Sequence, residues 1–163
     1  MDDWIDEPPR PQLWGRAGRP VGTVVAAVHG AYHVLSRRLA LEARDHALGP
    51  SEAVVLAFLR LQPDVTISVV RHGTGLRPST LDSLLDRLVA RGLLQRVSRR
   101  AERGEVTIVM TPAGRELADV AHAALAGIDE ELAVFAARST LEGAHVVFEA
   151  ARALGVPGTA ADY

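Results

Sequence analysis

The sequence predicts a mainly α-helical protein with one small β-hairpin, and three observations support this prediction. Of the 163 residues, 48% are apolar but only 4% are aromatic, so we expect a core of Ala, Val and Leu, which favours helices over a β-sandwich. Apolar residues recur at helical spacing along most of the chain. Two short β-prone runs, residues 93–97 and 106–110, flank the charged stretch SRRAERGE.

Residues 1–20 are expected to form an irregular arm, because they hold four of the nine prolines together with Trp4 and Trp14. This acidic start matches neither a signal peptide nor a transit peptide, and no apolar run approaches membrane-spanning length. We therefore expect a cytoplasmic protein with no membrane partner. The chain has no cysteine, which excludes a disulfide scaffold, a thiol nucleophile and a Cys-based zinc site.

Residues 21–47 are predicted to form one long N-terminal helix, which ends at Leu48-Gly49-Pro50. Its apolar stripe has three- and four-residue spacing and consists of Val24, Val28, Tyr32, Leu35 and Leu39. A second helix begins at Pro50 and ends before Pro63. One face of this second helix is predicted to carry Val54, Val55, Phe58 and Leu61.

A third, weaker helix is predicted over residues 66–73, and Gly75 then provides a turn. The next helix has Pro78 in its first turn, Arg77 or Ser79 as its cap, and Gly92 at its end. At 100° per residue, its buried side is Leu81, Leu84, Leu85 and Leu88. The opposite side is Ser79, Ser83, Asp86, Arg87 and Ala90.

The two β-prone runs form a predicted hairpin that closes a central domain over residues 48–111. Residues 112–156 are predicted to hold two further helices, and residues 157–163 a tail. The first of these helices begins at Thr111-Pro112, and the second runs from Ser139 to about residue 154. The stripe of the first consists of Leu117, Ala121, Ala124, Ile128, Leu132 and Phe135.

Two short helices joined by a Gly-containing turn and followed by a two-stranded hairpin make a winged helix-turn-helix. In such a unit the second helix fits the major groove of DNA, and the hairpin tip, or wing, reaches the flanking backbone and the minor groove. Residues 68–104 hold eight Arg and three acids, a net charge of +5, whereas residues 112–163 have a net charge of −5. This local basic charge predicts double-stranded DNA as a partner.

The central seventy residues resemble the MarR family, the multiple-antibiotic-resistance-type transcriptional regulators. The resemblance rests, in order, on LGPSEAVVLAFL, GLRPSTLDSLLDRLVARGLLQR and ERGEVTIVMTPAGREL. It implies a homodimer in which the long N- and C-terminal helices interlock as dimerisation helices. It also implies sequence-specific binding to a palindromic operator, usually as a repressor that a small-molecule effector releases. The effector would bind between the dimerisation and DNA-binding layers.

The resemblance also implies which residues contact DNA. On the recognition helix these are Arg77, Ser79, Thr80, Ser83 and Arg87, and on the wing they are Arg99, Arg100 and Arg103. Two positions depart from the family pattern. Ser83 stands where family members commonly carry a basic residue, and Gly104 stands at the usual wing arginine, within Glu102-Arg103-Gly104. Arg103 is next to that position, so its side chain leaves the strand in the opposite direction.

Two acids on the recognition helix have structural interpretations. Asp82 follows Ser79 by three residues and could close a capping box or interact favourably with the helix N-terminus. Asp86 could pair with an Arg of the wing or of the same helix. The alternative to operator binding is a winged-helix protein–protein interaction module whose arginines bind acidic partners.

No enzymatic site is predicted, because no nucleophile, paired carboxylates or cofactor loop occur in a recognisable setting. We therefore expect no enzyme and no cofactor. His29 and His33 lie four residues apart on one helix face, which is half of a possible metal site. Without a third ligand in the sequence we favour a packing or hydrogen-bonding role, and predict no metal. Tyr32, His29 and His33 are candidates for an effector pocket that the sequence alone does not assign.

Overall fold

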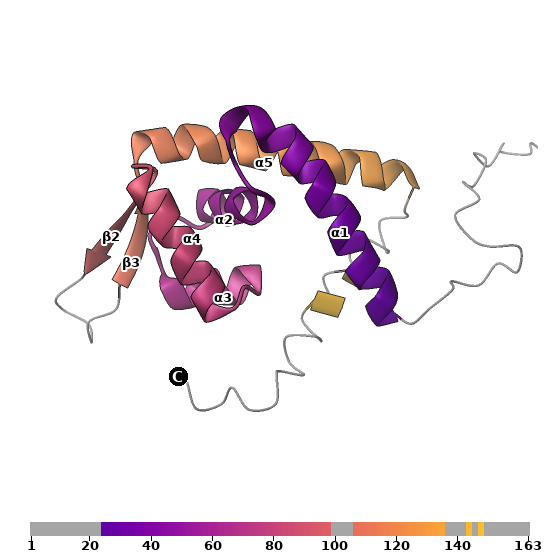
Figure 1. The fold of residues 1–163 in the computed structure, drawn as a ribbon, viewed down its shortest axis with the longest axis horizontal. Helices are drawn as coiled ribbons and strands as arrows, with labels where there is room; N and C mark the ends of the chain where they lie inside the picture. Colours follow the sequence, from indigo (N-terminus) through magenta and orange to yellow (C-terminus); the bar gives the residue numbers. More distant parts are fainter. Residues whose placement is uncertain (1–23, 99–105, 136–142, 145–146, 149–163) are drawn as a thin grey trace, which may run out of the picture. The chain divides into compact units, whose positions relative to one another are not determined.

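A computed structural model describes residues 24–98, 106–135, 143–144 and 147–148 of the chain (Figure 1). Five α-helices and three short antiparallel strands occur in these residues, which confirms the predicted mainly helical class with a small β-hairpin. The elements are α1 (Val24–Ala43), the 3-10 turn η1 (Arg44–His46), α2 (Pro50–Leu61), β1 (Val65–Thr66), α3 (Ile67–Thr74), α4 (Pro78–Ala90), β2 (Leu94–Ser98), β3 (Val106–Met110) and α5 (Pro112–Phe135).

The chain divides into two compact units, and residues 35–129 form the unit that contains α2, α3, α4 and the sheet. The predicted arm, the hairpin tip and the tail lie outside the described residues. Of the predicted last helix, residues 143–144 and 147–148 are described and are helical. None of the helices in the described part of the chain is both long and apolar enough to span a membrane.

The core of the residue 35–129 unit is built around α4. Its four predicted core leucines are at most 1% exposed, so the leucine stripe packs as expected. Pro78 occupies the first turn, where its missing N–H costs no hydrogen bond. At the other end Gly92 has φ +71°, and the amides of Gly92 and Leu93 donate to the carbonyls of Val89 and Leu88. This Schellman motif ends α4 and turns the chain into β2.

The sheet has the strand order β1-β3-β2, with both pairs antiparallel. The hairpin of β2 and β3 agrees with the sequence, and Figure 1 shows it beside α4. The prediction of a two-stranded sheet was incomplete, because Val65 pairs with Ile108 and Thr66 with Thr107. Two residues are too few to show an alternating pattern in the sequence, so β1 is defined only by its partner strand.

The predicted single apolar face of α2 was wrong, because its residues divide between two surroundings. Val55 is fully buried, whereas Leu61 is 64% exposed and Val54 is 36% exposed. The core side of α2 is instead Ala53, Val55, Leu56 and Leu59. Val54, Phe58 and Leu61 lie on another side of α2, where they line a groove together with residues of α5.

The side of α2 that carries Val54, Phe58 and Leu61 forms one wall of a groove, and α5 forms the other wall. The groove has a volume of about 270 Å³. An ion pair between Arg60 of α2 and Asp119 of α5 joins the two helices. The lining residues are Val54, Ala57, Phe58, Leu61, His122, Leu125, Ala126 and Asp129.

The apolar stripe of α1 changes its surroundings along the helix. Leu39 and Ala43 are buried in the core of the residue 35–129 unit. Towards the N-terminus of α1, Val28 is 48% exposed and Tyr32 is 61% exposed. Apolar side chains at helical spacing are thus left uncovered on the N-terminal half of α1.

The segment Thr111-Pro112-Ala113-Gly114 attaches α5 to the end of α4. Thr111 Oγ1 accepts from the amide of Gly114 at 3.0 Å, and it lies 2.8 Å from the carbonyl oxygen of Gly92. A Cβ added at Gly114 would lie 2.0 Å from the carbonyl oxygen of Leu93. The Thr111 hydroxyl caps the start of α5, and the absence of a side chain at Gly114 lets the Leu93 carbonyl approach closely. These two roles explain why Thr is followed three residues later by Gly in this segment.

Candidate nucleic-acid interface

The N-terminal end of α4 presents a polar, exposed surface. Arg77 is the N-cap, with φ −64° and ψ 147°, and its side chain makes no cap hydrogen bond. Ser79 therefore lies inside the first turn, and the predicted capping box of Ser79 with Asp82 does not form. The exposed residues here include Arg77, Ser79 and Thr80. The first-turn N–H groups lack a side-chain cap, so this end of α4 retains donors suited to an anion.

Ser83 is exposed on the same face, one turn further along α4. Its hydroxyl donates to the carbonyl oxygen of Ser79 at 2.9 Å. A hydroxyl has one proton and two lone pairs, so Ser83 keeps acceptor capacity while its proton is used within the helix. The position therefore suits an incoming N–H donor, such as a base amino group, better than a phosphate oxygen.

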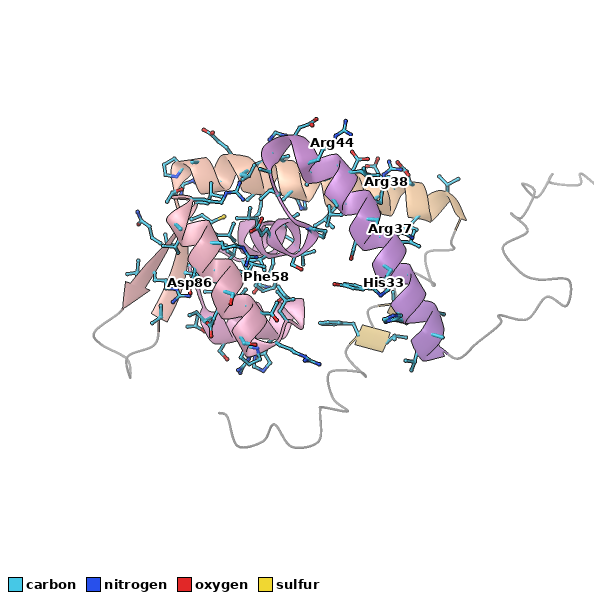
Figure 2. The ribbon with its side chains drawn as sticks, viewed as in Figure 1. His33, Arg37, Arg38, Arg44, Phe58 and Asp86 are labelled. Atoms are coloured by element: carbon cyan, nitrogen blue, oxygen red, sulfur yellow. The ribbon has the colours of Figure 1, made fainter. Side chains whose placement is uncertain are left out.

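Asp86 forms an ion pair with Arg96 of β2, with 3.0 Å between Oδ1 and Nη2. Figure 2 labels Asp86 on α4, next to the strands. Of the two partners expected for Asp86, an arginine of the wing or of the same helix, the structure has the hairpin arginine. The pair connects the recognition helix to the first strand of the wing. The acid on this helix is thus neutralised locally by a side chain of the same unit.

The predicted DNA contact Arg87 has a partner on α2. Its Nε donates to Oε1 of Glu52 at 3.2 Å, and its side chain is 60% exposed. Among the described residues, only Nε of Arg87 has such a partner, so its outer nitrogens are able to bind a phosphate. Glu52 thereby fixes the direction of a side chain that the sequence placed at the DNA surface.

Arg91 is a further residue of this site that the sequence reasoning missed. It donates to Oε2 of Glu52 at 3.4 Å and to the backbone carbonyls of Ala47 and His46 at 3.0 and 3.2 Å. Glu52 also accepts from the amide of Gly49 at 3.0 Å. The Glu52 side chain is only 11% exposed. One nearly buried carboxylate therefore accepts hydrogen bonds from two arginines and from the N-cap amide of α2.

The sequence contained part of this signal. Glu52 is the third helical residue after Gly49, the position where a carboxylate reaches back to the N-cap amide. Its arginine partners are 35 and 39 residues away in sequence, too far for any local pattern to reveal. In the structure, α4 and its N-cap carry the predicted contacts Arg77, Ser79, Thr80, Ser83 and Arg87. The ion pair with Glu52 of α2 holds the side chain of Arg87. The wing residues Arg99, Arg100 and Arg103 lie outside the described residues.

Comparison with known proteins yields structural neighbours only. No family model matches the sequence, and a search of curated proteins finds no match. Among solved structures, the M. tuberculosis transcriptional regulator MosR in complex with DNA superposes with a TM-score of 0.70 at 19% identity, covering 83% of this chain and 100% of MosR. The S. aureus MepR–DNA complex gives 0.68 at 14% identity, covering 82% and 97%.

Wild-type MarR from E. coli, in its apo form, superposes with a TM-score of 0.62 at 16% identity, covering 81% of this chain and 98% of MarR. The match covers nearly the full length of each of these neighbours. It therefore extends beyond the winged unit into the flanking long helices. At such identities the likeness establishes the fold. The chain has the winged helix-turn-helix fold of the MarR-family transcriptional regulators.

Proposed function

We propose that this chain is a sequence-specific DNA-binding transcriptional regulator that represses from a palindromic operator as a homodimer. The observation that carries the proposal is the N-terminal face of α4. It places Arg77, Ser79 and Thr80 at the surface while its leucines are buried. This polar helix end lies within the part of the sequence that holds a net charge of +5. Neighbours with the same fold include two regulators solved in complex with DNA.

The wing completes the proposed contact surface. Arg99, Arg100 and Arg103 are proposed to bind the backbone and minor groove that flank each half-site. The pair of Asp86 with Arg96 supports this arrangement, because it ties the recognition helix to the strand that leads into the wing. Ser83 is proposed to accept from a base edge rather than to neutralise a phosphate.

The proposed homodimer is supported by the uncovered stripe of α1. Val25, Val28 and Tyr32 are exposed at spacings of three and four residues. An isologous contact between two copies of the chain would bury this stripe on both. Two recognition helices related by a twofold axis would then read an inverted repeat.

The direct experiment is a selection of genomic DNA fragments by the purified full-length protein at low salt. We expect the bound fragments to share an inverted repeat whose half-sites lie about one helical turn, or roughly 34 Å, apart. Binding should weaken steeply as salt is raised, because several phosphates lose their condensed counterions. A bound set with no common palindrome would contradict operator recognition.

A second candidate is a winged-helix module that binds an acidic protein. The observations that favour it are the exposed Asp82 on α4 and the use of the Ser83 proton within the helix. The double variant Arg77→Ala, Arg103→Ala separates the two candidates, with Arg37→Ala, Arg44→Ala as a charge-matched control on α1 and η1 (Figure 2). Loss of DNA retention in the first variant alone, with the dimer intact, supports the regulator. Equal DNA retention in both supports the module.

Ligand responsiveness is proposed to reside in the groove between α2 and α5. Its wall is mainly apolar, with His122 and Asp129 as polar groups, and its volume of about 270 Å³ suits a single-ring molecule. Titration of DNA-bound protein with single-ring aromatic amines such as benzylamine tests this idea. We expect release of DNA from the wild-type protein, and none from Val54→Trp, whose indole fills the groove. Equal release from both proteins would place the effector elsewhere.

A further inference from the structure

The N-terminal half of α1 carries a pair of imidazoles with the geometry of a metal chelate. His29 and His33 are one helical turn apart, both are exposed, and Figure 2 labels His33 on α1. Their Nε2 atoms lie 3.0 Å apart. The rings meet edge to face, with centroids 4.4 Å apart and an interplanar angle of 79°. Without a metal, one ring donates its Nε2 proton to the other.

The distance between the two nitrogens places both within reach of one metal ion. Metal–imidazole bonds of about 2.1 Å that meet at a right angle place their nitrogens about 3.0 Å apart, whereas a tetrahedral angle places them about 3.4 Å apart. The observed 3.0 Å is the hydrogen-bond distance between the two rings, and it is short enough for both nitrogens to reach one metal ion. Small ring rotations would point both Nε2 lone pairs at one centre. The Tyr32 ring packs edge-on against His33, with centroids 5.4 Å apart, and restricts that ring.

Right-angle nitrogen ligation is typical of tetragonal Cu²⁺ and Ni²⁺, whereas structural Zn²⁺ prefers a tetrahedral set. The chain has no cysteine, so it offers no thiolate for Cu⁺. Within the described residues, no group of three or more His, Asp or Glu side chains converges on a common point. The two imidazoles would therefore be the protein ligands, and water would occupy the other positions.

We propose that His29 and His33 form a two-imidazole site for a divalent, tetragonally coordinated transition metal ion, with Cu²⁺ bound more tightly than Ni²⁺. The sequence alone favoured a packing or hydrogen-bonding role for this pair, and the metal-free structure has that hydrogen bond. The exposure of both rings and the closeness of their nitrogens also suit a ligand role. The site lies on α1, outside the proposed DNA-binding surface. It therefore stands or fails independently of the proposed DNA contacts of α4 and the wing.

The test is a titration of the untagged full-length protein with Cu²⁺, followed by calorimetry and by the nitrogen couplings in the electron paramagnetic resonance spectrum. The informative variants are His29→Gln, His33→Gln and the double variant His33→Gln, Val34→His. The double variant keeps six histidines but places the second imidazole five residues from the first. The control is His46→Gln, which removes an exposed histidine of η1.

We expect the wild-type protein and His46→Gln to bind one Cu²⁺ with two nitrogen ligands. The three α1 variants should bind Cu²⁺ about tenfold or more weakly, because the second imidazole no longer binds intramolecularly. Since both rings are exposed and contribute nothing to the core, these variants should retain the wild-type far-ultraviolet circular dichroism. Wild-type affinity in His33→Gln or in the double variant would overturn the proposal.

Discussion

The two ends of α4 differ in how their polar side chains are used. At the C-terminal end Asp86, Arg87 and Arg91 all have charged partners, on β2 or α2. At the N-terminal end Arg77, Ser79 and Thr80 are exposed, and among the described residues no side-chain hydrogen bond of theirs is found to another part of the fold. One end is held by the protein and the other is presented to solvent.

This difference teaches how a recognition helix can be both rigid and available. A helix that binds a groove must be fixed in direction, because a small rotation about one end displaces the other end by several ångströms. The Glu52 cluster and the Asp86–Arg96 pair provide that fixation away from the binding end. The N-terminal end then keeps its donors for DNA.

The largest expected effect comes from removing the carboxylate of Glu52. Glu52→Ala leaves Arg87, Arg91 and the Gly49 amide without their shared acceptor. We expect a loss of about 2–3 kcal/mol in the free energy of unfolding, less than for a fully buried pair because Arg87 stays partly hydrated. For a chain of this size that loss lowers Tm by about 4–12 °C. Denaturant unfolding and calorimetry measure both quantities.

The matched control is Glu42→Ala, which removes an exposed carboxylate paired with Arg38 at 2.9 Å on α1. A surface pair of this kind contributes about 0.5 kcal/mol or less. Equal losses of stability in the two variants would break the comparison, because Glu52 would then contribute no more than an ordinary surface acid.

The next largest effect concerns the connection behind the C-terminal end of α4. A Cβ at Gly114 would overlap the carbonyl oxygen of Leu93, which is backbone and cannot rotate away. We expect Gly114→Ala to destabilise the fold by about 2 kcal/mol, as overpacking outweighs the better helix propensity of alanine. Gly127→Ala is the control, since the added Cβ there meets nothing within 4 Å. A stabilised Gly114→Ala would contradict this packing account.

The smallest stability effect is expected at the Asp86–Arg96 pair. Both side chains are partly exposed, and Asp86→Asn should cost about 0.5 kcal/mol or less. Operator affinity should nevertheless fall, because α4 loses its link to the first wing strand. DNA titrations beside unfolding curves separate the two quantities. Unchanged DNA affinity in Asp86→Asn would show that Asp86 serves only as a solvated residue on the helix surface.

Local sequence patterns were sufficient for the elements that carry their own periodicity or turn chemistry. The leucine spacing of α4, Pro78 at its start, Gly92 at its end and the β2–β3 hairpin were all predicted and confirmed. The pair of Asp86 with a hairpin arginine was one of the two pairings that the sequence predicted.

Most of the features that the sequence did not predict depend on residues that are far away in the sequence. β1 exists only through its pairing with β3. Leu61 is exposed because other apolar residues of α2, such as Leu56 and Leu59, face the core. The Glu52 cluster joins two segments that are more than thirty residues apart in sequence. The predicted Ser79–Asp82 capping box does not form because the N-cap of α4 is Arg77, two residues before Ser79.

The measurement that tests the central claim most directly is the salt dependence of operator binding for the wild-type protein, Arg77→Ala and Arg44→Ala. Fluorescence anisotropy with a selected DNA fragment gives the affinity at each salt concentration. If the N-terminal end of α4 holds DNA, Arg77→Ala should bind more weakly and lower the slope of log affinity against log salt by about 1, whereas Arg44→Ala should match the wild type. Wild-type affinity and slope in Arg77→Ala would contradict the assignment of this end of α4 to DNA.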